Sequence, residues 1–165
     1  MDILKVLVTI GSMSEKKFTR LFKIIDELCE ESILDRNQVI AQVGFDNYES
    51  NYYKTFDMIS DSEFKQKIIE CDLIITHAGT GTIMSALKKN KKVILFPRME
   101  KYDEHYDNHQ LEISEIFKNK NLVLCATTKK ELIQCISKIK SFTPGKFNSN
   151  NSYINEKIIN FIEGI

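Results

Sequence analysis

The sequence predicts an α/β protein, a single doubly wound, Rossmann-like domain with a parallel sheet of about six strands. Short apolar runs rich in β-branched residues recur along the chain, as in strands that are buried on both faces of a sheet. Between these runs, apolar residues fall at three- and four-residue spacing, which is typical of amphipathic helices. Glycine or proline follows several runs, at Gly11, Gly44, Gly79 and Pro97. Strands that alternate with helices in this way indicate a sheet covered by helices.

The first half of the chain predicts three strands and two helices. A β-branched run ended by Gly11 predicts the first strand, and Ser60 with Glu63 forms a capping-box pattern that opens the second helix. Apolar residues that share one face predict the first helix: Phe18, Leu21, Phe22, Ile25 and Leu28. The expected elements are a strand over 5–10, a helix over 16–31, strands over 39–43 and 52–56, and a helix from Ser60 through Ile69.

The second half predicts three more strand–helix pairs. Pro97 ends one apolar run, and Thr128 with Glu131 forms a second capping-box pattern. The expected elements are strands over 73–76, 93–96 and 122–125, and helices over 81–89, 106–119 and from Thr128 to about Lys140. These elements complete a domain over residues 1–141.

The polar stretch FTPGKFNSNNS, residues 142–152, interrupts the pattern and predicts a linker. After it, apolar residues fall on one face of a final helix: Ile154, Ile158, Phe161, Ile162 and Ile165. The sequence therefore predicts a linker and a C-terminal amphipathic helix over residues 142–165.

Composition excludes several classes of protein. The 23 basic residues balance 23 acidic ones, so no global field would recruit nucleic acid. The start, MDILKVLVTI, has no basic region or cleavage site, and no apolar run approaches the roughly 20 residues of a membrane helix. The 4 cysteines are far apart and form no C-x-x-C pair, which favours free thiols in a reducing cytoplasm.

The segment DLIITHAGTGTIMS, residues 72–85, places Gly79-Thr80-Gly81-Thr82 between an expected strand and an expected helix. Such a turn lies at the edge of a doubly wound sheet where ligands bind, and the free amides of the helix start attract phosphate. The other interpretation is that the turn contains glycine for steric reasons alone and binds no ligand. The third glycine of a dinucleotide fingerprint would fall at Met84, and no Gly-Lys-Ser/Thr of a Walker loop follows. The turn therefore indicates a phosphate, and in particular a diphosphate.

A second polar cluster, RMEKYDEHYDNHQLE, covers residues 98–112. His105 and His109 could share a helix face as metal ligands do, but no third ligand stands at a diagnostic spacing, so no metal is expected. Amide and imidazole groups at Asn108, His109 and Gln110 could instead bind neutral hydroxyls such as those of a sugar. The lysine-rich run 88–92 predicts a solvated turn, with attraction to anionic lipid as the alternative.

Five segments carry a resemblance to a known family: VLVTIGSMS (6–14), VIAQVG (39–44), DLIITHAGTGTIMSAL (72–87), VILFPR (93–98) and DNHQLE (107–112). They resemble the C-terminal, nucleotide-sugar-binding half of MurG-type glycosyltransferases. They are most similar to the split relatives, which are the small subunit of the eukaryotic dolichol-linked GlcNAc transferase and the PssE-type subunit of bacterial capsule and exopolysaccharide transferases. The resemblance implies the C-terminal half of a GT-B fold that holds a UDP-sugar.

The resemblance also implies roles for individual residues. Gly11 and Ser12 match a turn near the phosphates, and Asn108, His109 and Gln110 match the segment that contacts the donor sugar. Several relatives have a ribose-binding glutamate where this chain has Ser85, so ribose recognition is expected to be weaker here or supplied elsewhere. The diphosphate loop is matched by His77, Ala78, Gly79, Thr80, Gly81 and Thr82.

We therefore expect the donor-binding subunit of a split UDP-sugar-dependent hexosyltransferase without a cofactor, acting on a lipid-linked saccharide in capsule or exopolysaccharide synthesis. The resemblance implies a membrane-anchored partner that carries the acceptor site and the general base. Ile154, Ile158, Phe161 and Ile162 are expected to dock on this partner and to hold the cytoplasmic chain peripherally at the membrane. The alternatives are a non-catalytic nucleotide- or phosphate-binding module, and a nucleotide-sugar epimerase or hydrolase.

Overall fold

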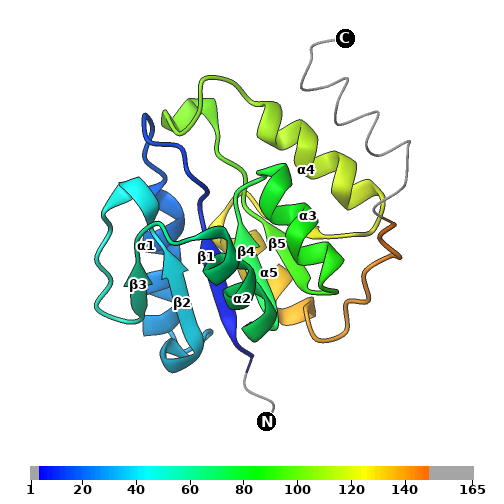
Figure 1. Ribbon diagram of the computed structural model, residues 1–165, viewed down its shortest axis with the longest axis horizontal. Helices are drawn as coiled ribbons and strands as arrows, with labels where there is room; N and C mark the ends of the chain where they lie inside the picture. Colours follow the sequence, from blue (N-terminus) through cyan, green and yellow to red (C-terminus); the bar gives the residue numbers. More distant parts are fainter. Residues whose placement is uncertain (1–3, 149–165) are drawn as a thin grey trace.

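The structure, a computed structural model, describes residues 4–148, which form a parallel sheet of 6 strands with helices on both faces (Figure 1). The strand order is β3-β2-β1-β4-β5-β6. The strands are β1 (Val6–Thr9), β2 (Val39–Gln42), β3 (Lys54–Phe56), β4 (Leu73–Thr76), β5 (Lys92–Leu95) and β6 (Leu124–Cys125). The fold class predicted from the sequence is confirmed, whereas the predicted final helix lies outside the described residues.

The central strand β1 pairs in parallel with β2 on one side and with β4 on the other. Val6 of β1 lies opposite Val39 of β2 and Leu73 of β4, and each strand then advances in step with its neighbour. This register brings the carboxyl ends of β1 and β4 to the same edge of the sheet, so the loops that follow them begin side by side.

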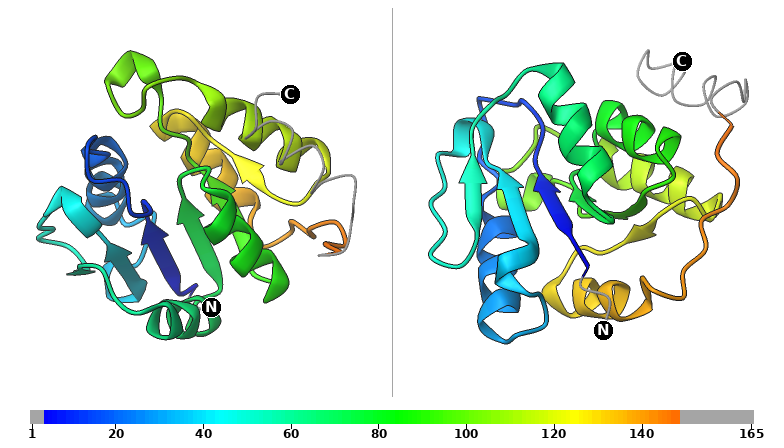
Figure 2. Two further views of the ribbon diagram at one scale, coloured as in Figure 1. Left: turned by 45° about the horizontal axis from the view of Figure 1, so that its top comes forward. Right: turned by 60° about the horizontal axis from the view of Figure 1, so that its bottom comes forward.

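Helices α1 (Thr19–Glu30) and α5 (Lys129–Lys138) cover one face of the sheet, while α2 (Asp61–Glu70), α3 (Thr80–Lys88) and α4 (His109–Asn119) cover the other (Figure 2). Side chains of β1 alternate between the two cores, because successive residues of a strand point to opposite faces. Val6 and Val8 pack with α1 and α5, whereas Leu7 packs with α2, α3 and α4. This two-sided burial explains the continuous apolar runs of the strands.

Most element boundaries differ from the sequence-based prediction by one or two residues, and the starts of two helices differ by more. Helix α1 begins at Thr19 instead of residue 16, and α4 begins at His109 instead of residue 106. The last strand contains only Leu124 and Cys125, while Leu122 and Val123 belong to the core on the α4 side of the sheet. The Leu122 amide donates to the Phe117 carbonyl at 3.1 Å. This hydrogen bond closes the end of α4, so the Leu122 amide does not extend the sheet.

Three short 3-10 helices, not expected from the sequence, lie in the loops: η1 (Arg36–Gln38), η2 (Gly44–Asp46) and η3 (Glu100–Tyr102). The first part of the expected linker also has contacts with the domain. The Gly145 amide donates to the Asn121 carbonyl at 2.7 Å, and Phe147 packs against the core beneath α4. The described end of the chain therefore lies beside the carboxyl end of α4.

All 4 cysteines are free thiols, as the sequence predicted, and Cys29, Cys71 and Cys135 are buried. Burial raises the pKa of Cys29 and of Cys71 to about 11, so these thiols stay protonated near pH 7. Within residues 4–148, no helix is long and apolar enough to cross a membrane.

The chain changes direction across the sheet between β1 and β4. From β1 it passes through α1 to β2, and from β4 it passes through α3 to β5 on the opposite side. At such a reversal the two following loops diverge and leave a crevice outside the carboxyl ends of the strands, where doubly wound proteins bind their ligands. The site residues predicted from the sequence follow β1, β4 and β5 at this edge.

Candidate functional site

The imidazole of His77, at the end of β4, lies between two glycines. A Cβ atom on Gly11 would lie 2.6 Å from the ring, and one on Gly79 would lie closer than 3.0 Å to it. Gly11 also has φ +74°, a left-handed conformation that side chains disfavour. The His77 ring thus accounts for both glycines and joins the loop after β1 to the loop after β4.

His77 is a neutral hydrogen-bonding group near pH 7. Burial lowers its pKa to about 3, and the positive charges of Arg98 and His105 act in the same direction. Its Nδ1 atom lies 3.2 Å from the Thr76 hydroxyl. The ring therefore gives the crevice a polar wall without adding a positive charge of its own.

Among residues 4–148, no side chain accepts from the free amides at the amino end of α3. Its N-cap is Gly79, no side chain caps it, and its first turn contains no acidic residue. The first amide bonded along the helix is that of Ile83, which donates to the Gly79 carbonyl at 3.2 Å. By contrast, α2 and α5 both begin with a complete capping box. The α3 amides therefore point a partial positive charge into the crevice, as an anion site requires.

Gly81, in the first turn of α3, is exposed, and a Cβ atom there would meet nothing within 4 Å. The space beside Gly81 is therefore open, unlike the space beside Gly79, which the His77 ring fills. Of the two glycines in the Gly-Thr turn, Gly81 is the one beside which a bound group has room.

Gln110, in the first turn of α4, is buried and holds two loops together. Its Oε1 atom accepts from the Arg98 amide at 2.9 Å and from the Ala78 amide at 3.3 Å. Both partners are donors, so the oxygen must face them and the NH₂ group must face the other way. That NH₂ group donates to no residue within 4–148 and remains the group that Gln110 can offer to a ligand.

The other predicted residues lie in different settings. Asn108 closes the loop after β5, because its Oδ1 accepts from the Glu100 amide at 3.1 Å and its Nδ2 donates to the Glu100 carboxylate at 3.2 Å. Ser12 is exposed in the loop after β1. Ser85 lies farther along α3 and lines a surface groove with Lys65 of α2 and with Lys88.

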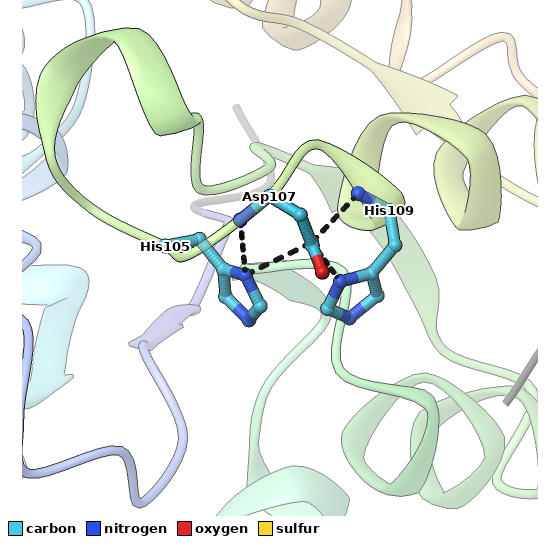
Figure 3. A group of neighbouring side chains, drawn as sticks. All are labelled: His105, Asp107 and His109. Atoms are coloured by element: carbon cyan, nitrogen blue, oxygen red, sulfur yellow. Dashed lines mark hydrogen bonds and ion pairs between the residues drawn. The ribbon is translucent and has the colours of Figure 1, made fainter.

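Asp107 lies between His105 and His109, with one ring on each side of its carboxylate (Figure 3). The Asp107 Oδ1 atom is 3.1 Å from His105 Nδ1, contacts His109 Nδ1, and accepts from the His109 amide at 3.0 Å. One atom from each residue lies within 4.8 Å of the others, a spacing that could hold a metal ion. On the helix predicted for residues 106–119, no third ligand stands at a diagnostic spacing, whereas a bend at Asp107 brings its carboxylate between the two rings. These local hydrogen bonds account for the arrangement without an ion.

Arg98, which follows β5, is a site residue that sequence reasoning did not single out. Its side chain is fully buried at the crevice, and its amide shares the Gln110 oxygen with Ala78. The only signal in the sequence was an arginine at the end of the apolar segment VILFPR.

Residues 5–161 match the family model described as the glycosyltransferase family 28 C-terminal domain. The chain belongs to this family. This family 28 domain is 27% identical over 149 residues to the human UDP-N-acetylglucosamine transferase subunit ALG13. The aligned segment covers 86% of this chain and 12% of the human protein. The Candida albicans protein of the same name is 36% identical over 59% of the chain and 32% of its own length.

The family 28 domain thus spans a third or less of these two curated relatives. It also resembles solved structures over nearly its whole length. The solution structure of ALG13 superposes with a TM-score of 0.63 at 21% identity, covering 94% of this chain and 95% of that one. The crystal structure of the calicheamicin glycosyltransferase CalG4 superposes with a TM-score of 0.61 at 12% identity, covering 98% of this chain and 39% of that one. These likenesses support a GT-B C-terminal half for the described fold.

Proposed function

We propose that this family 28 domain is the donor-binding subunit of a split GT-B glycosyltransferase that uses a UDP-sugar. The observation that carries the proposal is the amino end of α3, which has free amides, no side-chain cap and open space at Gly81. The relatives named as UDP-N-acetylglucosamine transferase subunits support the same donor class. A diphosphate is the anion that this site and these names have in common.

In the proposed reaction, an acceptor hydroxyl attacks the anomeric carbon of the sugar. A new carbon–oxygen bond forms, the bond from that carbon to the diphosphate breaks, and UDP leaves with the electron pair. The α3 amides and the hydroxyls of Thr80 and Thr82 would stabilise the charge that develops on the diphosphate. We assign the general base, which takes the proton of the acceptor hydroxyl, to the partner subunit.

The remaining roles are proposals of the same kind. Gly11 and Ser12 would border the phosphates, and the neutral His77 ring would donate or accept one hydrogen bond there. The free NH₂ group of Gln110 would contact a sugar hydroxyl, with His109 beside it. Ser85 lies in the groove between α2 and α3, so ribose contact there would require the nucleoside to extend along α3.

The biological setting is also proposed. A relative from Prochlorococcus marinus is 24% identical over 82% of the chain and 39% of its own length, and it is named as an N-acetylmuramyl-(pentapeptide) pyrophosphoryl-undecaprenol N-acetylglucosamine transferase. That name supports a lipid-linked acceptor for this chain. We further propose a PssE-type role in capsule or exopolysaccharide synthesis, beside a membrane-anchored partner at the cytoplasmic side of the membrane.

Calorimetric titration with UDP tests the donor site. Gly81→Val places two methyl groups where a phosphate would lie and should abolish UDP binding, yet a side chain there meets no neighbour in the fold. Lys138→Val, at an exposed position at the end of α5 on the other face of the sheet, serves as the control and should bind UDP like the wild type. If the wild type fails to bind UDP, both alone and with its partner, the chain is not a UDP-sugar donor subunit. A non-catalytic module would bind UDP but support no transfer with any partner.

A further inference from the structure

Arg98 is among the largest side chains that are fully buried in the described residues. Its guanidinium donates to three main-chain carbonyls: Nη1 to Lys16 at 2.8 Å and to Glu104 at 3.2 Å, and Nη2 to Ile10 at 3.1 Å. Ile10 and Lys16 flank the Gly11 turn, while Glu104 lies in the loop after β5. A single cation therefore ties two of the crevice loops together.

Among residues 4–148, no carboxylate contacts the Arg98 guanidinium directly, although the negative charges of Asp46 and Glu104 act on it from nearby. The two nearby acids are bound elsewhere: Asp46 accepts from the Phe18 amide at 2.6 Å, and Glu104 binds Arg20 through two bonds of 2.7 and 2.9 Å. The Arg98 Nε atom is buried and has no hydrogen-bond partner among residues 4–148. Because a guanidinium keeps its charge in proteins, the interior at this edge holds a cation whose polar groups are incompletely satisfied.

The influence of this charge extends to the crevice. Arg98 contributes to the lowered pKa of His77, the residue packed between Gly11 and Gly79. The Arg98 and Ala78 amides also share the Gln110 oxygen, which places the start of the β5 loop against the Gly-Thr turn. A buried charge is screened less than an exposed one, so it acts over a longer distance.

We propose that Arg98 is a positioning residue for the donor diphosphate: it fixes the Gly11 turn and supplies a permanent positive potential beneath the crevice. This inference rests on the proposed UDP-sugar function. A buried cation that no carboxylate contacts is costly, and a diphosphate bound above it would recover part of that cost. The contribution should therefore grow with the charge of the ligand and be absent for a neutral one.

The test compares Arg98→Met, which removes the charge, with Arg98→Lys, which keeps the charge but loses the planar set of guanidinium donors. Binding of UDP, UMP and uridine is measured by calorimetry. We expect Arg98→Met to weaken UDP about tenfold or more, UMP less, and uridine by no more than about twofold. Arg98→Lys should keep the ratio of UDP to uridine affinity within about threefold of the wild type. Arg36→Met makes the same change in net charge before β2, at the opposite edge of the sheet, and should leave all three affinities unchanged.

Equal losses for UDP and uridine in Arg98→Met would overturn the inference, since a purely structural role would affect both ligands alike. An unchanged UDP affinity would overturn it as well. If Arg98→Met does not fold, Arg98→Lys decides: a ratio that falls by more than about tenfold despite the retained charge refutes a role for the potential. If the wild type binds none of the three ligands, the proposed function is refuted. If the wild type binds UDP and Arg98→Met keeps the ratio of UDP to uridine affinity, only this inference is refuted.

Discussion

His77 explains at the scale of single residues why the crevice contains so many glycines. Its ring fills the space beside Gly11 and Gly79, while the space beside Gly81 stays open. The glycines of one short motif therefore serve different purposes, and only the packed structure separates them. Gln110 gives a similar example, because its oxygen supports two loops and only its NH₂ group remains for a ligand.

The two glycines of the Gly-Thr turn make a matched pair for measuring this difference. Gly79→Ala should lower the free energy of unfolding by about 1–3 kcal/mol, because the new methyl group must displace the His77 ring. Gly81→Ala should change it by no more than about 1 kcal/mol, and in the stabilising direction, because alanine favours the helix. Urea denaturation of both variants provides the measurement, and equal values would show that the ring does not constrain Gly79.

The lowered pKa of His77 makes stability depend on pH in a defined direction. The unfolded chain takes up a proton on this histidine near pH 6.5, whereas the folded protein takes it up only near pH 3. Between these values the unfolded state binds more protons, so the free energy of unfolding falls as the pH falls. His105, whose pKa is also lowered, acts in the same direction.

Replacing His77 by glutamine should therefore flatten the pH dependence. Urea denaturation at about pH 7 and at about pH 5 avoids the titration of most carboxylates. Between these two values, we expect the free energy of unfolding to fall less in His77→Gln than in the wild type. His105 remains in both proteins, so its contribution cancels. The same slope in both proteins would mean that His77 is protonated in the fold as readily as in the unfolded chain.

At the scale of elements, the helix starts show which signals are local. The capping boxes at Ser60 and at Thr128 were predicted from the sequence and are both present. Helix α1 has no such signal, and its start is fixed by Asp46 of η2, whose carboxylate accepts from the Phe18 amide at 2.6 Å. An acceptor 28 residues away in the chain cannot be read from the sequence around the helix.

Removal of the Asp46 carboxylate should destabilise the protein. Asp46→Ala leaves the Phe18 amide without its acceptor, and we expect a loss of about 1–2 kcal/mol, typical of a lost helix cap. Thermal and urea denaturation give the value, with Asp57→Ala at an exposed position as the control. An Asp46→Ala variant as stable as the control would show that the cap contributes nothing to the fold.

At the scale of the whole molecule, a GT-B enzyme needs a second domain to complete the active site, and the described residues form one domain only. The predicted helix over 153–165 lies outside the described residues, and its apolar face is known from the sequence alone. A short helix is marginal in water unless such a face is buried, which favours docking on the partner or on its own domain.

Deletion of residues 153–165 distinguishes these two possibilities. If the face docks on the partner, the truncated chain should keep its UDP affinity and lose co-purification with the partner, since each buried apolar side chain contributes roughly 1.5–3 kcal/mol before entropy costs. Calorimetry and affinity purification of the co-expressed proteins provide the two measurements. A truncated chain that forms the complex with unchanged affinity would place the docking surface elsewhere.

The sequence by itself determined the strands, most helices, the free thiols and the location of the Gly-Thr turn, because periodicity, caps and turns depend on neighbouring residues. The tertiary structure decided the strand order, the packing of His77 between Gly11 and Gly79, and the burial of Arg98. The Arg98 side chain reaches Ile10 across 88 residues, and the Asp107 carboxylate meets two rings because a turn replaces the expected helix. Such contacts depend on which loops the fold brings to one edge of the sheet, and no local pattern in the sequence specifies them.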